Sequence, residues 1–309
     1  MYHEDEGPVE SLVHLYIDGA FNRRELIRRV AKYTGGVVSA GAAVAALGVT
    51  AADDAAAQNF CTDDMRVPAN AVDLAMEDVA FGGESGTIYA HVARPRFQAD
   101  PLPAVLVIHE NRGLNEHIKD VTRRFARASF VGVGIDLLSR EGGTDKFPDP
   151  AAAGAAYNRT TVDGRLQDML STLAWMKQQS YIQGDRMGCV GFCAGGANSF
   201  NLAVSTSDIA AAVVYYGAAP SPIDRIANLN APILLQFAHL DTNLTLALAP
   251  VLTNLIAGRK TFGIHIYEGA RHAFNNDTGA AFDRQAACEA WARTTDFFGR
   301  HLRKPRVVT

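Results

Sequence analysis

The sequence predicts an α/β fold in which a doubly wound, mostly parallel sheet carries helices on both faces. Three features of the chain after residue 71 lead to this prediction. Short runs that are apolar at every position, such as 104–109, are typical of strands buried on both faces of a parallel sheet. These runs alternate with segments of helical periodicity. The first two strand-like runs instead flank the turn residues 82–86, which indicates a hairpin and an antiparallel edge.

The expected elements follow this alternation along the chain. We expect strands at 75–81, 87–94, 104–109, 130–135, 187–192, 209–216, 231–239 and 262–267. We expect helices at 117–129, 162–179, 197–203, 244–256 and 280–302. Residues 139–160 contain Gly142, Gly143, Pro148 and Pro150 and are expected to form a loop, as are residues 217–230. No internal repeat is visible, so residues 75–304 are expected to form one domain.

Composition excludes several classes of protein. Of the 309 residues, 48% are hydrophobic and 20% are charged, a balance that allows a large core. The formal net charge of −4 argues against a nucleic-acid partner. The four cysteines form no CxxC pair and have no zinc-type spacing with histidine, so we expect neither a metal site nor a disulfide framework.

Residues 1–60 differ in character from the rest, and two interpretations stay open. In one, residues 9–18 form an amphipathic helix and Asn22 caps a second, giving an N-terminal helical segment. In the other, the stretch 23–27 (RRELI), followed by an uncharged Ala- and Gly-rich run, resembles a twin-arginine export signal. A membrane anchor is disfavoured because Ala and Gly contribute little apolar burial. Residues 61–74 are expected to be a connector to the domain.

The stretch 191–196 (GFCAGG) separates an apolar run from a small-residue run, in the order strand, tight turn, helix. Gly-x-Cys-x-Gly has the form of the nucleophile elbow of α/β-hydrolases, with Cys193 in place of serine. Gly191 and Gly195 lack Cβ atoms, which lets strand and helix approach closely. The N-terminus of the helix would favour a thiolate. The alternative is a buried structural cysteine in a glycine-rich turn.

Polar residues follow four of the predicted parallel strands, where ligands bind in open α/β sheets. These residues are Glu110, Cys193, Asp241 and His272. The order nucleophile, acid, histidine is that of α/β-hydrolases. Alone, Asp241 could be a helix cap and His272 an ordinary loop histidine. Their joint occurrence at strand ends favours a catalytic site.

Each residue type fits a step of acyl transfer. A Cys193 thiolate would attack a carbonyl carbon, and His272 would accept the thiol proton and later pass it to the leaving group. Asp241 would fix the imidazole tautomer. The backbone N–H groups of Ala194 and Asn111 are the expected oxyanion donors.

The runs VIHENRGL at 107–114, GFCAGG at 191–196 and GARHAF at 269–274 together resemble the dienelactone hydrolase (carboxymethylenebutenolidase) family over about residues 75–302. The resemblance implies an α/β-hydrolase fold and a Cys–His–Asp triad that hydrolyses esters or lactones without a cofactor. It also implies that Glu110 contacts the thiol and helps to form the thiolate when substrate arrives; the alternative is a structural pairing of Glu110 with Arg112 or another cation.

The chain differs from the family at the residues that are expected to bind the substrate. The family has an arginine four residues after the catalytic histidine, and this chain has Asn276. A second substrate-binding arginine of the family has no secure counterpart here; the candidates are Arg140, Arg159 and Arg165. Arg112, Arg159 and Asn276 are the expected substrate contacts, and Tyr157 is a further pocket candidate. The catalytic chemistry is therefore better supported than the substrate that gives the family its name.

The leading hypothesis is a cysteine hydrolase of small esters or lactones, whose partner is that small molecule. A thioesterase or peptidase-like acyl hydrolase uses the same three residues, and a non-catalytic binding protein on the same fold is the alternative of another class. Because a catalytic thiol persists more easily in a reducing compartment, the cytoplasm is favoured over the periplasm. The sequence predicts neither the oligomeric state nor the physiological substrate.

Overall fold

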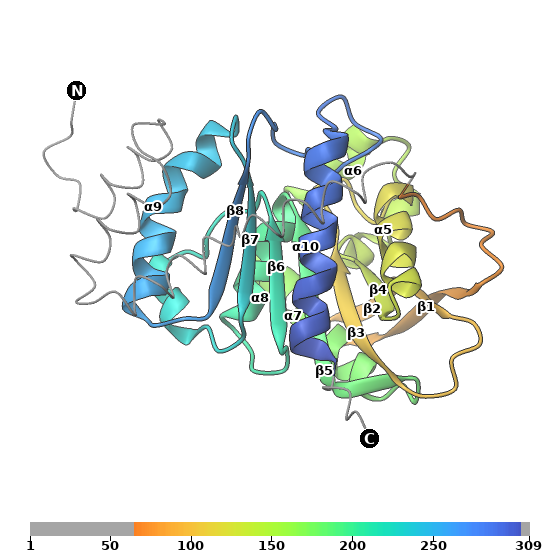
Figure 1. Cartoon of the computed structure of the whole chain (residues 1–309). Coiled ribbons are helices and arrows are strands. Elements are labelled where there is room, and N and C mark those ends of the chain that lie inside the picture. Colours follow the sequence, from red (N-terminus) through yellow and green to blue (C-terminus); the bar gives the residue numbers. More distant parts are fainter. Residues whose placement is uncertain (1–64, 304–309) are drawn as a thin grey trace, which may run out of the picture.

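An eight-stranded sheet forms the centre of the protein (Figure 1). The structure is a computed structural model that describes residues 65–303, apart from the side chains of residues 242–247. The strands are β1 (Leu74–Gly83), β2 (Gly86–Pro95), β3 (Leu102–Ile108), β4 (Val131–Asp136), β5 (Ile182–Phe192), β6 (Ala211–Tyr215), β7 (Ile233–Ala238) and β8 (Phe262–Tyr267). Their order in the sheet is β1-β2-β4-β3-β5-β6-β7-β8. Only the pairs β1–β2 and β2–β4 are antiparallel, so the predicted mostly parallel sheet with an antiparallel edge is confirmed.

Burial explains why the inner strands read as unbroken apolar runs. Every residue of β4, β6 and β7 is buried, whereas buried and exposed residues mix along the edge strand β1. The register aligns the carboxyl ends of the parallel strands. Ile108 pairs with Gly191, Phe192 with Tyr215, and Ala238 with Tyr267. The residues that follow these strands therefore emerge at one edge of the sheet.

Helices cover both faces, as predicted (Figure 1). Helices α5 (Glu116–Arg127) and α10 (Arg284–Leu302) lie on one face, where the Phe125 ring packs 4.7 Å from that of Trp291. Helices α7 (Val162–Lys177) and α8 (Ala194–Ala203) pack against each other on the opposite face. Helix α9 (Thr242–Ala257) contacts β7 and the short 3₁₀ helix η3 (Ile223–Asn228).

The expected loop at residues 139–160 is partly helical, so that prediction was wrong for residues 150–157. Two 3₁₀ turns, η1 (Ser139–Glu141) and η2 (Thr144–Lys146), lead to helix α6 (Pro150–Tyr157). The Asp149 carboxylate accepts a hydrogen bond from the Ala152 N–H and caps this helix. Proline breaks a helix in its interior, but at the first helical position its missing N–H has no partner to lose, so Pro150 favours a helix start.

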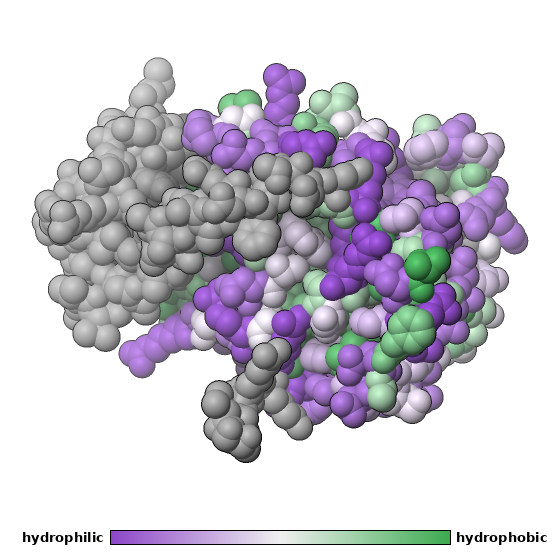
Figure 2. Space-filling view, turned by 45° about the vertical axis from the view of Figure 1, so that its right-hand side comes forward, coloured by the Kyte–Doolittle hydropathy of each residue, from purple (hydrophilic) through white to green (hydrophobic). Residues whose placement is uncertain are grey.

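Residues 65–73 form turns before β1, and they are held against the domain by a small apolar cluster. Val67, Ala71 and Leu74 pack there with Ala93 and Ala126. The predicted N-terminal segment 1–60 and residues 61–64 of the predicted connector lie outside the described residues. The face seen in Figure 2 is largely hydrophilic with small hydrophobic patches. Among the helices of the described part of the chain, none is long and apolar enough to cross a bilayer.

Candidate active site

The turn between β5 and α8 is as tight as the sequence pattern indicates. Cys193 is the N-cap of α8, with φ 55° and ψ −116°. A Cβ atom on Gly191 would lie 1.8 Å from the Gly195 carbonyl oxygen, and one on Gly195 would lie 2.3 Å from the Ile108 carbonyl oxygen. Glycine is therefore required at both positions by close approach of backbone to backbone. The contact with Ile108 also brings the end of β3 beside the turn.

Three predicted residues form a continuous chain of hydrogen bonds. His272 Nε2 lies 3.1 Å from Cys193 Sγ. His272 Nδ1 is hydrogen-bonded to Asp241 Oδ2. Asp241 is buried, whereas 44% of the His272 side chain is exposed. The strand ends thus bring together a sulfur, an imidazole and a carboxylate from three separate parts of the chain.

The contacts of His272 favour its protonated form. The hydrogen bond to Cys193 raises the pKa of His272 to about 9, and the bond to Asp241 acts in the same direction. Burial opposes this shift because it disfavours a charged ring. These contacts therefore favour the protonated imidazole of His272 over the neutral one.

Glu110 lies at the same edge, but its hydrogen bond is to another residue. Glu110 is buried, and its Oε2 accepts a 2.7 Å bond from Asn276 Nδ2. Its Oε1 is buried without a partner among the described residues. The buried ring of His109 fixes the backbone here: Nε2 accepts from the Leu137 N–H and Nδ1 donates to the Glu110 carbonyl oxygen. Within the described part of the chain, the hydrogen-bond partner of Glu110 is Asn276, and neither the thiol nor a cation such as Arg112.

The ring of Tyr216 lies beside His272 and forms one side of the candidate site, although the sequence analysis did not name this residue as a site candidate. It follows β6 with φ 38°, is almost wholly buried, and its ring lies 5.1 Å from that of His272. Its hydroxyl has no partner among the described residues. Burial raises the pKa of Tyr216 well above its ordinary value, and the neighbouring Glu110 and Cys193 add to this. The sequence carried one available signal, since Tyr216 is the last residue of the expected strand 209–216 and therefore lies at its carboxyl end.

The two expected oxyanion donors are backbone N–H groups on either side of the turn. Ala194 is the first residue of α8, where the amide has no partner within the helix. Asn111 lies in the turn that follows β3. The close contact of Gly195 with the last residue of β3 draws these two segments together.

The arginines considered from the sequence lie in different surroundings. Arg112 is exposed, and Arg159 is exposed and donates to the Ala155 carbonyl oxygen of its own helix. Arg140 is paired with Asp168. Only Arg165 turns inward, where it lies 4.7 Å from the centre of the Tyr157 ring and donates to Asn198 Oδ1.

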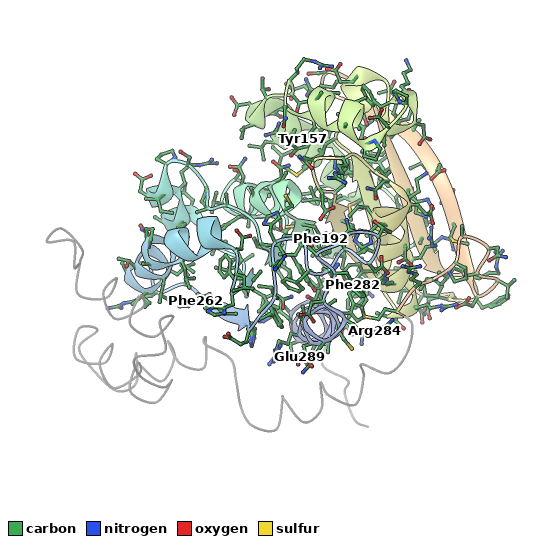
Figure 3. The ribbon with its side chains drawn as sticks, turned by 90° about the horizontal axis from the view of Figure 1, so that it is seen from above. Tyr157, Phe192, Phe262, Phe282, Arg284 and Glu289 are labelled. Carbon is green, nitrogen blue, oxygen red and sulfur yellow. The ribbon has the colours of Figure 1, made fainter. Side chains whose placement is uncertain are left out.

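Tyr157 ends α6 and lies on the other side of the sheet from α10 (Figure 3). Its hydroxyl accepts a 2.7 Å bond from Asn198 Nδ2, on the helix that starts at Cys193. No group of three or more potential metal ligands occurs among residues that the structure describes.

The fold and the elbow place this chain among the α/β-hydrolases. A comparison with models of protein families identifies the family within this class. The model of the dienelactone hydrolase family matches residues 88–302 of the chain. The chain belongs to this family, and it is a dienelactone hydrolase-like enzyme of the ester and lactone hydrolase class.

Similar proteins are found by sequence and by structure. A Bradyrhizobium protein named "Probable 2-oxo-3-(5-oxofuran-2-ylidene)propanoate lactonase" is 32% identical over 249 residues, which covers 76% of this chain and 98% of that protein. A Saccharolobus solfataricus protein named "Putative carboxymethylenebutenolidase" is 28% identical over 72% of this chain and 98% of its own length. The crystal structure titled "Putative Dienelactone Hydrolase" from Klebsiella pneumoniae has a TM-score of 0.68 and 26% identity, and covers 74% of this chain and 99% of that one.

Proposed function

We propose that the enzyme hydrolyses small esters or lactones through a covalent thioester on Cys193. The observation that carries the proposal is the hydrogen-bond chain from Asp241 through His272 to a sulfur on a strained turn at a helix N-terminus. This arrangement pairs a nucleophile with a base that a third group orients. A helix N-terminus and an adjacent imidazolium both favour the thiolate.

The reaction then has two balanced steps. The Cys193 thiolate attacks the carbonyl carbon, the C–O bond of the ester breaks, and the His272 proton passes to the departing alkoxide. Water next attacks the thioester while His272 takes its proton, and the C–S bond breaks to restore the thiolate. In a lactone the alcohol stays attached to the acid, so one product forms. The N–H groups of Ala194 and Asn111 are placed in this proposal as donors to the oxyanion.

Glu110 has a separate role in this proposal. In the resting structure Asn276 holds one of its oxygens, while the other is buried and unpartnered. We infer that Glu110 approaches the thiol only when substrate displaces the Asn276 contact, and that it then accepts the thiol proton. Glu110→Gln removes this acceptor and keeps the shape, so it should lower the rate of thiol alkylation in the presence of a substrate analogue more than in its absence.

The nucleophile is tested by replacing it. Cys193→Ala should lower kcat/KM for p-nitrophenyl acetate by at least about 10³-fold, because the residues of such a chain act as a unit. Cys189→Ala is the matched control: Cys189 is wholly buried in the core on β5, the strand that leads to the turn, and the variant should keep activity within severalfold. Mass spectrometry of a rapidly quenched reaction should show the acyl group on Cys193. Undiminished turnover by Cys193→Ala would overturn the proposal.

The substrate class needs a panel, because the same chain of residues serves several acyl groups. We would compare a 5-oxofuran-2-ylidene lactone, suggested by the name of the Bradyrhizobium relative, with p-nitrophenyl esters, an acyl thioester and a small amide. The proposal expects the highest kcat/KM for a lactone or an oxygen ester. A clear preference for the thioester or the amide would instead favour the alternative acyl hydrolases. Arg112→Ala and Asn276→Ala then test whether those side chains contact the acid part.

A further inference from the structure

The loop after His272 carries a carboxylate that is held by three positively charged or ionisable groups. Asp277 Oδ2 accepts from Arg66 Nε at 3.0 Å and from Arg124 at 2.8 Å. Asp277 Oδ1 lies 2.9 Å from His117 Nδ1. Arg66 also donates to the Asp277 backbone oxygen at 2.9 Å. Burial alone would raise the pKa of Asp277, but the bond from His117 and the charge of Arg124 outweigh it and hold that pKa below its usual range.

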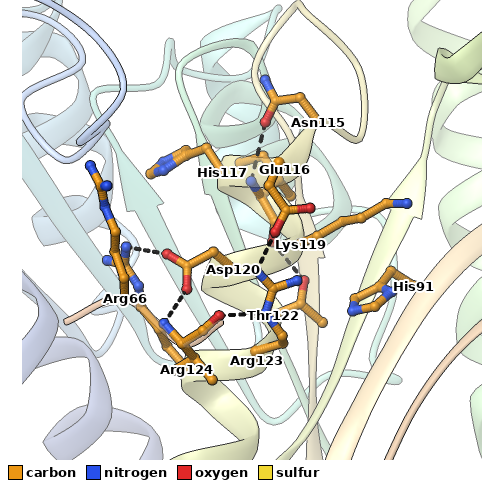
Figure 4. Close-up of polar contacts among 12 residues, drawn as sticks. Arg66, His91, Asn115, Glu116, His117, Lys119, Asp120, Thr122, Arg123 and Arg124 are labelled. Atoms are coloured by element: carbon orange, nitrogen blue, oxygen red, sulfur yellow. Dashed lines mark hydrogen bonds and ion pairs between the residues drawn. The ribbon is translucent and has the colours of Figure 1, made fainter. Parts of the chain in front are cut away.

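These partners come from two elements that are themselves tied together (Figure 4). Arg124 and His117 belong to α5, where Asp120 is paired with Arg124. Asp120 also accepts a 2.6 Å bond from the Val67 N–H, and Arg123 donates to the Val67 carbonyl oxygen. The segment before β1 is therefore fixed on α5, and Arg66 reaches from it to the loop.

Asn276 connects this loop to the candidate active site. Asn276, directly before Asp277, donates from Nδ2 to Glu110. Its Oδ1 accepts from the Thr278 N–H at 3.0 Å and from the Thr278 hydroxyl, so the amide has a fixed orientation. Asn276 is the fourth residue after His272.

We propose that Arg66 and Asp277 are positioning residues, which hold the His272 loop on α5 so that Asn276 keeps Glu110 at the place from which it reaches the thiol when substrate arrives. Without this support Glu110 is misplaced before the reaction begins, and thiolate formation slows. Arg66 lies before residues 88–302, the part matched by the family model, so a residue outside that part acts on the catalytic edge. The inference rests on the proposed function, because Glu110 matters only if it serves the Cys193 chemistry.

A double-mutant cycle between Arg66 and Asn276 tests the proposal in the full chain. The Arg66 side chain is 56% exposed, so Arg66→Ala should leave the melting temperature nearly unchanged. It should lower kcat for p-nitrophenyl acetate roughly five- to tenfold, with little change in KM. In an Asn276→Ala background the same change should have no further effect, because the residue through which Arg66 acts is gone. Asp277→Asn should lower kcat in the same direction.

Arg127→Ala is the matched control. Arg127 is on the same helix and joins it to Asp73 of the same segment through an exposed ion pair, but it does not touch the loop. It should keep wild-type kcat. The proposal is overturned if Arg66→Ala equals this control, or if its effect is the same with and without Asn276.

Failure of the proposed function gives a different result. If Cys193→Ala keeps its activity, the nucleophile is wrong. If Cys193→Ala is inactive while Arg66→Ala behaves as wild type, only the positioning role is wrong.

Discussion

Backbone strain gathers at individual residues of the candidate site. Cys193, Tyr216 and Ala273 have φ values of 55°, 38° and 66°, in a region that favours glycine. Each such residue costs about 1–3 kcal/mol and persists only where its surroundings fix it. Here the surroundings are the glycine contacts of the turn and the aromatic packing of Tyr216 against His272 and Phe274. The strained residues are thus the one that carries the candidate nucleophile, the tyrosine packed against the imidazole, and the residue directly after His272.

The raised pKa of His272 makes a predictable contribution to stability. The pKa rises from 6.5 to about 9 on folding, so the folded state binds the proton more tightly. The resulting stabilisation is fully present below about pH 6.5 and is lost as pH rises through about 9. Urea unfolding at pH 6 and pH 9.5 should show a loss of stability in the wild type that is smaller in His272→Gln.

Cys193→Ala serves as a second arm of this experiment, since the bond to Cys193 is the largest cause of the shift. It should reduce the same pH dependence while leaving the imidazole in place. An identical pH dependence in all three proteins would show that the His272 contacts do not couple to folding.

At the scale of elements, the approach of one strand end to one helix start determines the site. Gly195 lets α8 come against the end of β3, and this contact brings Cys193 beside the segment that carries Glu110. Helix α6 lies beside them and carries Tyr157, whose hydroxyl binds Asn198 of α8. Two helices and a strand therefore share the edge at which Cys193 emerges.

A single methyl group should disrupt the contact between α8 and β3. The Cβ of Gly195→Ala would lie 2.3 and 2.4 Å from the carbonyl oxygens of Ile108 and His109, which are backbone atoms and cannot rotate away. We expect a loss of about 3 kcal/mol in the free energy of unfolding, and a loss of activity. Gly299→Ala is the control, because nothing lies within 4 Å of its Cβ and it is inside α10.

Gly299→Ala should instead stabilise the protein by about 0.5–1 kcal/mol, the difference in helix propensity. Chemical denaturation measures both changes. Equal effects of the two substitutions would mean that the close approach at Gly195 is not what fixes the turn.

Helix α6 depends on its cap. Asp149→Ala removes the acceptor for the Ala152 N–H and should cost about 1 kcal/mol. Because α6 carries Tyr157 to Asn198, faster hydrogen exchange in residues 150–157 should accompany this loss. Asp163→Ala, in the first turn of α7 but not its capping residue, should have a smaller effect. Unchanged exchange in α6 would contradict a role for the cap.

At the scale of the whole molecule, local sequence patterns predict the strands and the polar residues at their ends. They do not predict contacts between residues that are far apart in the sequence. Apolar runs gave the strands, and polar residues at their ends gave Cys193, Asp241 and His272, because parallel strands must end at one edge. The pairing of Glu110 with Asn276 joins positions 166 residues apart, and that of Arg66 with Asp277 joins positions 211 apart. No periodicity marks such pairs. Helix α6 was missed for a local reason, since Pro150 can either break or start a helix.

The boundary of the domain can be tested by two shortened chains. We propose that a chain starting at residue 62 keeps the fold and the activity, since it retains the contacts of Arg66 and Val67 with α5 and the loop. A chain starting at residue 69 loses the buried Val67 side chain and leaves the buried Asp120 without the Val67 N–H. Lost apolar burial and an unpaired carboxylate oxygen together should cost about 3 kcal/mol. Thermal unfolding and kcat/KM should therefore separate the two chains, and equal values would place the true boundary after residue 68.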